Sequence, residues 1–165
     1  MCILIFFQFY LAALALLILN RFCDGLDGTM ARLTTPTPLG GYLDIVSDFT
    51  IYSGFILAFG FSNSSYTYLS MILLFLYIGT GTTFLAKAAI QTQLDRISET
   101  NDTIEELPKS FHYTSGLVEG TETIIFMALC LLLPNLFVLI SIVFGILCLI
   151  TFISRVIVCY VEFNL

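Results

Sequence analysis

Three long stretches of the chain contain no charged residue, namely residues 1–20, 49–86 and 123–154. A helix that crosses a membrane needs about 20 mostly apolar residues. The stretch 49–86 is therefore too long for one such helix, and its polar segment 62–65 marks a turn. Pro134-Asn135 divides the last stretch in the same way. The pattern predicts five helices, at residues 2–22, 38–60, 67–88, 113–133 and 136–157.

Composition places the chain in a membrane. Hydrophobic residues make up 58% of it and charged residues 11%, whereas a soluble domain averages about 50% and about 25%. These values exclude a disordered chain, a coiled coil and a conventional soluble enzyme. We therefore expect a single all-α domain over residues 1–165, built as a polytopic membrane helix bundle. The net charge of -6 is opposite to that of a nucleic-acid-binding protein, so no nucleic-acid partner is expected.

The basic residues indicate the orientation. With five helices, all six fall on one side of the membrane: Arg21, Arg32, Lys87, Arg96, Lys109 and Arg155. Loops rich in Lys and Arg face the cytoplasm. The chain is thus expected to start outside and end inside.

Four aspartates lie in two pairs around the first predicted connection. Asp24 and Asp27 are three residues apart, and Asp44 and Asp48 are four apart, so each pair projects from one helix face. The two helices are consecutive and antiparallel, so these faces can meet. Asp48 is expected roughly 15 Å inside the second helix. Carboxylates at such depth are costly and are functional candidates by default.

Four neighbouring carboxylates repel one another unless they are protonated or neutralised. One or two divalent cations would neutralise them, and carboxylate oxygens suit Mg²⁺, Mn²⁺ or Ca²⁺. Two bridged metals form a clamp for phosphoryl chemistry. Gly25, Gly28, Gly40 and Gly41 leave space beside the acids for a phosphate ligand. Arg32 adds a positive group suited to phosphate.

The acidic pattern resembles a known family signature. Asp-x-x-Asp-Gly-x-x-Ala-Arg, followed by Gly-x-x-x-Asp-x-x-x-Asp, is similar to the motif of the CDP-alcohol phosphatidyltransferases. Here the motif consists of Asp24, Asp27, Gly28, Ala31, Arg32, Gly40, Asp44 and Asp48. Seven residues separate Arg32 from Gly40, one fewer than is commoner in the family.

The resemblance implies a reaction. A phosphatidyl, or substituted phosphate, group passes from a CDP-linked lipid such as CDP-diacylglycerol to an alcohol acceptor, and CMP is released during phospholipid biosynthesis. The resemblance also implies that the four aspartates bind two divalent cations, Mg²⁺ or Mn²⁺, and that Asp48 is the general base. It places phosphate and nucleotide binding at Gly28, Ala31, Arg32 and Gly40.

The resemblance further implies a homodimer in a bacterial cytoplasmic membrane, with the active site facing the cytoplasm. Family members usually have six helices, and the Asp-x-x-Asp motif closes the second. Here the motif closes the first predicted helix. The chain is therefore expected to be either a short natural variant or a fragment lacking the amino-terminal helix.

Three further residues are candidates for an acceptor pocket. Glu119 and Glu122 are expected about six to ten residues inside the fourth helix, at a depth similar to that of Asp44 and Asp48. They either form a pocket wall or are paired or protonated in the packing. An acidic pocket would suit a cationic or polyhydroxyl alcohol better than a phosphorylated one. Lys87 either contacts a phosphate or extends to the membrane surface.

Other functions are also considered. A cation transporter should carry polar residues across the whole membrane, yet the outer half of this chain holds no charge. Polyprenyl transferases have Asp-rich membrane sites but lack the Gly-x-x-Ala-Arg continuation found after Asp27. A catalytically inactive homologue or fragment remains an alternative to the enzyme.

Overall fold

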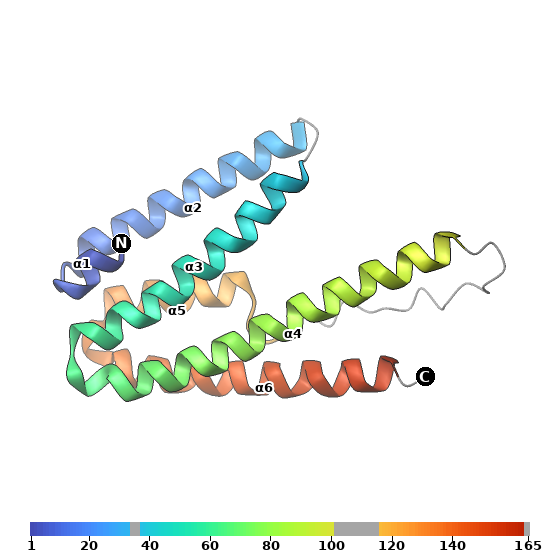
Figure 1. Ribbon diagram of the computed structural model, residues 1–165. Coiled ribbons are helices and arrows are strands. Elements are labelled where there is room, and N and C mark those ends of the chain that lie inside the picture. The colour runs from blue at the N-terminus through green and yellow to red at the C-terminus, as the bar shows by residue number, and fades with distance from the viewer. Residues whose placement is uncertain (34–36, 101–115, 164–165) are drawn as a thin grey trace.

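The computed structural model describes residues 1–33, 37–100 and 116–163, with the backbone alone at 27–33, 95 and 98–100. The described residues form helices without any strand, which confirms the all-α prediction (Figure 1). Two 3₁₀ turns, η1 (Ser64–Tyr66) and η2 (Pro134–Leu136), join the later helices. The α-helices are α1 (Cys2–Phe6), α2 (Tyr10–Leu33), α3 (Pro38–Ser62), α4 (Thr67–Thr100), α5 (Gly120–Leu132) and α6 (Phe137–Phe163).

Local sequence explains several helix ends. Thr37 caps α3, because its hydroxyl accepts a hydrogen bond from the Gly40 amide at 3.2 Å, and Pro38 opens the first turn. The predicted turn after Ser62 is confirmed, with the Asn63 side chain accepting from the Ser65 amide at 2.9 Å. The predicted break at Pro134 is also confirmed.

The predicted first helix, residues 2–22, is wrong in its bounds. Gln8 has a φ of 62°, which a right-handed helix cannot contain, so α1 ends at Phe6 and α2 begins at Tyr10. No proline precedes Pro36, and α2 continues to Leu33. The acidic motif therefore lies inside the second helix of the described chain, not at the end of the first.

The bounds of two other helices also differ from the prediction. α4 continues to Thr100 because no glycine or proline lies between Gly81 and Pro108. Residues 89–100, which lie between the predicted helices 67–88 and 113–133, are thus helical, and 101–115 lie outside the described residues. α5 begins at Gly120, so Glu119 caps it and Glu122 lies in its first turn. The expectation that these glutamates lie deep inside a helix is wrong.

The helices form a bundle whose two ends differ. α4 packs along α6 and α3 along α4, while α2 contacts α5 and α1. The α2–α3 connection, the carboxyl end of α4 and the chain terminus lie at one end, where α3 and α4 diverge (Figure 1). Aromatic stacking fixes the interior nearer the other end. The Phe59 and Phe137 rings are 4.3 Å apart, and those of Phe126 and Phe144 are 4.1 Å apart.

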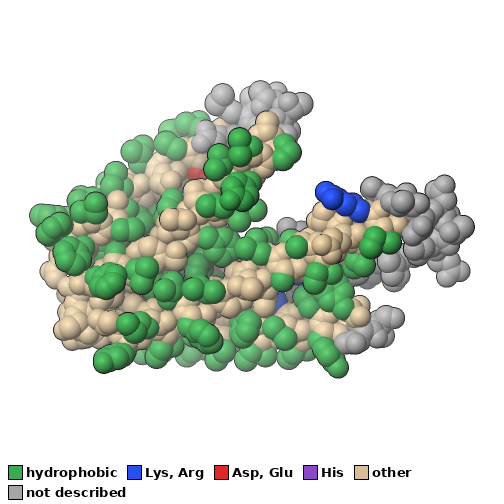
Figure 2. All heavy atoms as spheres, in the orientation of Figure 1, with side chains coloured by type: hydrophobic (Ala, Val, Ile, Leu, Met, Phe, Trp, Pro, Cys, Tyr) green, Lys and Arg blue, Asp and Glu red, His purple; other side chains and the backbone are tan. Residues whose placement is uncertain are grey.

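The surface suits a lipid environment. Figure 2 shows hydrophobic side chains along every visible helix, with few charged groups among them. Three stretches of the described chain, 38–62, 64–94 and 134–163, are long and apolar enough to cross a membrane. α5 has 13 residues and spans only about 20 Å. The fold is thus a membrane helix bundle, and the predicted total of five spans stays a prediction.

Close packing of α3 on α4 gives a testable consequence. A Cβ at Gly60 would lie 2.9 Å from the Ser70 Cβ, whereas one at Gly41 in the same helix would meet nothing within 4 Å. We expect Gly60→Ala to lower the free energy of unfolding by about 1–3 kcal/mol. Gly41→Ala should leave it unchanged or raise it by about 0.5 kcal/mol. Denaturation in detergent micelles measures both, and equal stability of the two variants would contradict this packing.

Candidate active site

An ion-pair network joins α2 to α3 at the acidic motif. The Arg21 guanidinium of α2 lies 2.9 Å from Asp48 Oδ1 of α3 and 3.3 Å from Asp24 Oδ2 of its own helix. Arg21 also donates to Asn20 Oδ1 at 2.8 Å. One cation thus links a carboxylate from each half of the motif.

Tyr52 completes the surroundings of Asp48. It lies one helical turn after Asp48, and its hydroxyl donates to Asp48 Oδ2 at 3.0 Å while accepting from Arg21 at 3.2 Å. Both oxygens of the Asp48 carboxylate therefore have a hydrogen-bond partner. The orientation of this carboxylate is fixed from two helices.

The structure brings three of the four predicted acids together. Asp44 lies one turn before Asp48, and both Asp24 and Asp48 are close enough to act on it as like charges. The side chains of Asp27, Gly28, Ala31 and Arg32 lie outside the described residues. Gly40 is in the first turn of α3, where it bonds to the Thr37 cap.

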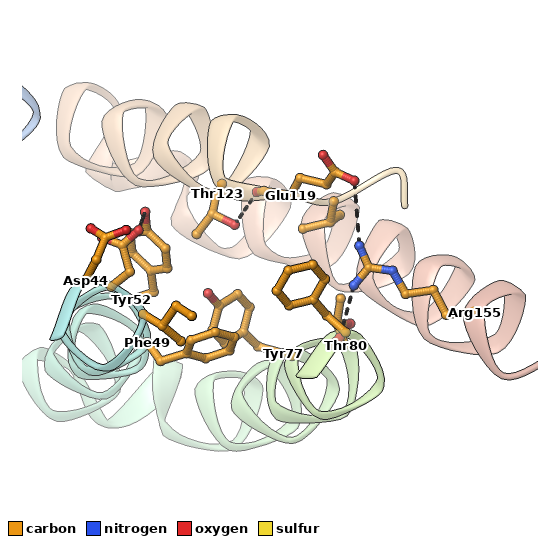
Figure 3. A pocket seen from close by; sticks show the side chains of 14 residues that line it. Asp44, Phe49, Tyr52, Tyr77, Thr80, Glu119, Thr123 and Arg155 are labelled. Atoms are coloured by element: carbon orange, nitrogen blue, oxygen red, sulfur yellow. Dashed lines mark hydrogen bonds and ion pairs between the residues drawn. The ribbon is translucent and has the colours of Figure 1, made fainter. Parts of the chain in front are cut away.

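The acids border a cavity of about 280 Å³ enclosed by residues of α3, α4 and α6 and by the start of α5 (Figure 3). Asp44, Asp48 and Tyr52 line it from α3. At Gly81 of α4 the cavity lining is tightly packed, because a Cβ there would overlap the Phe49 ring of α3. A small ligand in this cavity would lie directly beside the acidic motif.

Arg155 of α6 lines the cavity away from the aspartates and is only 7% exposed. Its guanidinium donates to the Thr80 carbonyl at 3.2 Å and lies 3.7 Å from Glu119 Oε1. It also stands 5.6 Å from the centre of the Phe84 ring, within cation–π range. In Figure 3 the Arg155 side chain reaches toward both Glu119 and Thr80.

The three residues predicted to line an acceptor pocket have different surroundings in the structure. Glu119 lines the cavity. The Glu122 carboxylate instead accepts from the Glu119 amide at 3.0 Å and thereby caps α5. Lys87 is outside the described lining and forms an ion pair with Glu162 of α6 at 2.8 Å.

The sequence analysis did not single out Arg21, Tyr52 and Arg155 as residues of the candidate site. Arg21 precedes Asp24 by three residues and Tyr52 follows Asp48 by four, the spacings that place side chains on one helix face. These spacings could have revealed both. Arg155 follows a charge-free run of 32 residues, and a charged residue in such a place marks a functional site by default.

The donor set has the chemistry that a hard divalent cation prefers, since Asp24, Asp44 and Asp48 offer carboxylate oxygens from facing helices. Among the described residues, however, no three acid, histidine or cysteine side chains lie close enough to hold one metal ion. Arg21 supplies the positive charge between Asp24 and Asp48 in this arrangement.

Comparison with known proteins identifies the family. A family model described as CDP-alcohol phosphatidyltransferase matches residues 1–156. The chain belongs to this family. It is also 44% identical over 153 residues to the "Inner membrane protein YnjF" of Escherichia coli (strain K12), an alignment that covers 89% of this chain and 69% of that protein. No solved structure matches the chain significantly.

Family membership supports phosphatidyl transfer from a CDP-alcohol to an alcohol in lipid synthesis. The relative from Escherichia coli is an inner membrane protein by name, and the fold of this chain agrees with a membrane location.

The Arg21 network can be tested by a double-mutant cycle. Arg21→Met leaves Asp24 and Asp48 without their shared cation, so we expect the free energy of unfolding to fall by about 1–3 kcal/mol. In an Asp48→Asn background the same change should cost less, because one of the two carboxylates is gone. Unfolding in detergent micelles measures the coupling, and strictly additive effects would contradict the ion pair.

Proposed function

We propose that this protein transfers a phosphatidyl group from CDP-diacylglycerol to an alcohol and releases CMP. The observation that carries the proposal is that Asp44 and Asp48 line a cavity, with Asp24 close to both, within the sequence motif of the family. The cavity can hold the acceptor next to the reacting phosphate, while the acyl chains of the donor remain in lipid.

Asp24, Asp27, Asp44 and Asp48 would hold one or two Mg²⁺ or Mn²⁺ ions. When bound, such ions neutralise the charge of the donor pyrophosphate and of the departing CMP. Arg32 would bind phosphate, and Gly28, Ala31 and Gly40 would leave room for the nucleotide.

In the proposed reaction Asp48 takes the proton from the acceptor hydroxyl. The acceptor oxygen then forms a bond to the phosphorus of the phosphatidyl group. The bond from that phosphorus to the oxygen of CMP breaks, and CMP leaves with the electron pair. Tyr52 and Arg21 orient the Asp48 carboxylate through the hydrogen bonds described above.

The site is proposed to face the cytoplasm. All six basic residues fall on one side of the predicted topology. The α2–α3 connection and the carboxyl ends of α4 and α6 share one end of the bundle. A homodimer is also proposed, on the resemblance to the family.

A second candidate is a membrane homologue without activity. The observation that favours it is that Arg21 already pairs with Asp24 and Asp48, so the acids have a counter-charge within the protein itself. An activity assay distinguishes the two candidates.

The assay measures CMP release from CDP-diacylglycerol by purified protein in nanodiscs, with Mg²⁺ or Mn²⁺ and a panel of alcohols. We expect acceptor-dependent release that chelation with EDTA abolishes. Asp48→Asn should reduce the rate by about 10²–10⁴-fold, the range typical of a lost general base.

Glu162→Gln provides the matched control, because it also replaces an ion-paired carboxylate but lies outside the cavity lining. It should retain the wild-type rate. A folded wild-type protein that releases no CMP with any acceptor would favour the inactive homologue. Equal rates for Asp48→Asn and wild type would remove Asp48 from the mechanism.

A further inference from the structure

The end of the cavity formed by α6 and the start of α5 contains a positively charged side chain that other protein groups already contact. Arg155 is buried, and its guanidinium is shared between the Thr80 carbonyl and the Glu119 carboxylate. The other charged side chains among the described lining residues are the acids Asp44 and Asp48. Arg155 is thus the single basic side chain of that described lining, and protein groups already contact it.

The position of Glu119 is set by the backbone around it. Its Oε1 accepts from the Gly116 amide at 3.1 Å, and the Val118 amide donates to Thr151 Oγ1 of α6 at 3.1 Å. Gly116 itself packs tightly, because a Cβ there would overlap Thr151. This hydrogen bond and this close packing hold the segment 116–119 on α6, which keeps Glu119 beside Arg155.

The start of α5 offers little to an anion. A helix amino terminus ordinarily attracts negative charge through its unpaired amides. Here Glu119 and Glu122 form a capping box, in which the Glu119 amide donates to the Glu122 carboxylate at 3.0 Å and the Glu122 amide donates to the Glu119 side chain. The carboxylate of Glu122 occupies the place that a phosphate oxygen would take.

A phosphate group at this end would bring about two negative charges next to Glu119. It would compete with Glu119 for Arg155 and would share the cavity with the carboxylates of Glu119, Asp44 and Asp48, which repel a second anion. A neutral hydroxyl group meets no such penalty and can donate to the carboxylate. The volume of about 280 Å³ suits a small acceptor.

Resting on the proposed function, we infer that the acceptor is a small alcohol that carries no phosphate group, and that the Glu119–Arg155 ion pair excludes phosphorylated acceptors. Glu119 acts by keeping Arg155 engaged, so it is a specificity-determining residue. Arg155 would be able to bind a phosphate group if the negative charge of Glu119 were removed.

The test uses matched acceptors that differ only in phosphate, namely glycerol against glycerol 3-phosphate and inositol against inositol phosphate. CMP release from CDP-diacylglycerol in nanodiscs gives the ratio of rates for each pair. For the wild type we expect the unphosphorylated member of the preferred pair to be used at least tenfold better. Glu119→Gln keeps an oxygen for the Gly116 amide and should shift this ratio toward the phosphorylated member by about tenfold or more.

A binding measurement separates this inference from the proposed activity. Inorganic phosphate should raise the melting temperature of Glu119→Gln by more than that of the wild type or of Glu162→Gln, which share the proposed phosphate site at Arg32. The double variant Glu119→Gln/Arg155→Gln should lose that additional response. This readout does not depend on turnover.

Wild-type preference for the phosphorylated acceptors, or a folded Glu119→Gln variant with neither a changed ratio nor a larger response to phosphate than the wild type, would overturn the inference alone. Absence of CMP release with every acceptor would overturn the proposed function instead. In that case the phosphate response of Glu119→Gln still decides whether Glu119 masks Arg155.

Discussion

The need to balance neighbouring negative charges on two facing helices dominates this structure. Asp24, Asp44 and Asp48 lie close together on two helices that otherwise present hydrophobic surface. Like charges so close together are costly unless a cation offsets them. Arg21 offsets part of this cost by pairing with one carboxylate from each helix, which also links α2 to α3 at the motif. The charge balance of the site and this link between the two helices thus involve the same contact.

Different kinds of interaction stabilise the two ends of the bundle. Stacked aromatic rings of α3, α5 and α6 fill the interior near the α3–α4 and α5–α6 turns. Polar contacts hold the opposite region, where α3 and α4 diverge and the cavity forms. Apolar packing thus stabilises one end of the bundle, and ion pairs position the charged groups at the other end. The cavity with its charged residues thus lies apart from the aromatic core.

Much of this arrangement could be predicted from the sequence, because local signals determine it. The turn after Ser62, the break at Pro134 and the start of α3 at Pro38 each follow from a capping residue or a proline. The start of α5 could not be predicted, since contacts with Thr151 and Arg155 hold residues 116–119 out of the helix. The engagement of Arg155 by Glu119 is likewise a tertiary contact between residues 36 positions apart in the chain, and no periodicity reveals it.

Gly81 gives the cavity a feature independent of its charges. The Phe49 ring of α3 lies where a Cβ of Gly81 would be, and both residues line the cavity. Any larger residue at this position would overlap the ring and force it to move. The absence of a side chain at Gly81 therefore permits the close contact of α3 and α4 that forms this part of the cavity lining. The room available to a ligand can thus be adjusted through the α3–α4 backbone contact, separately from the groups that recognise or react with it.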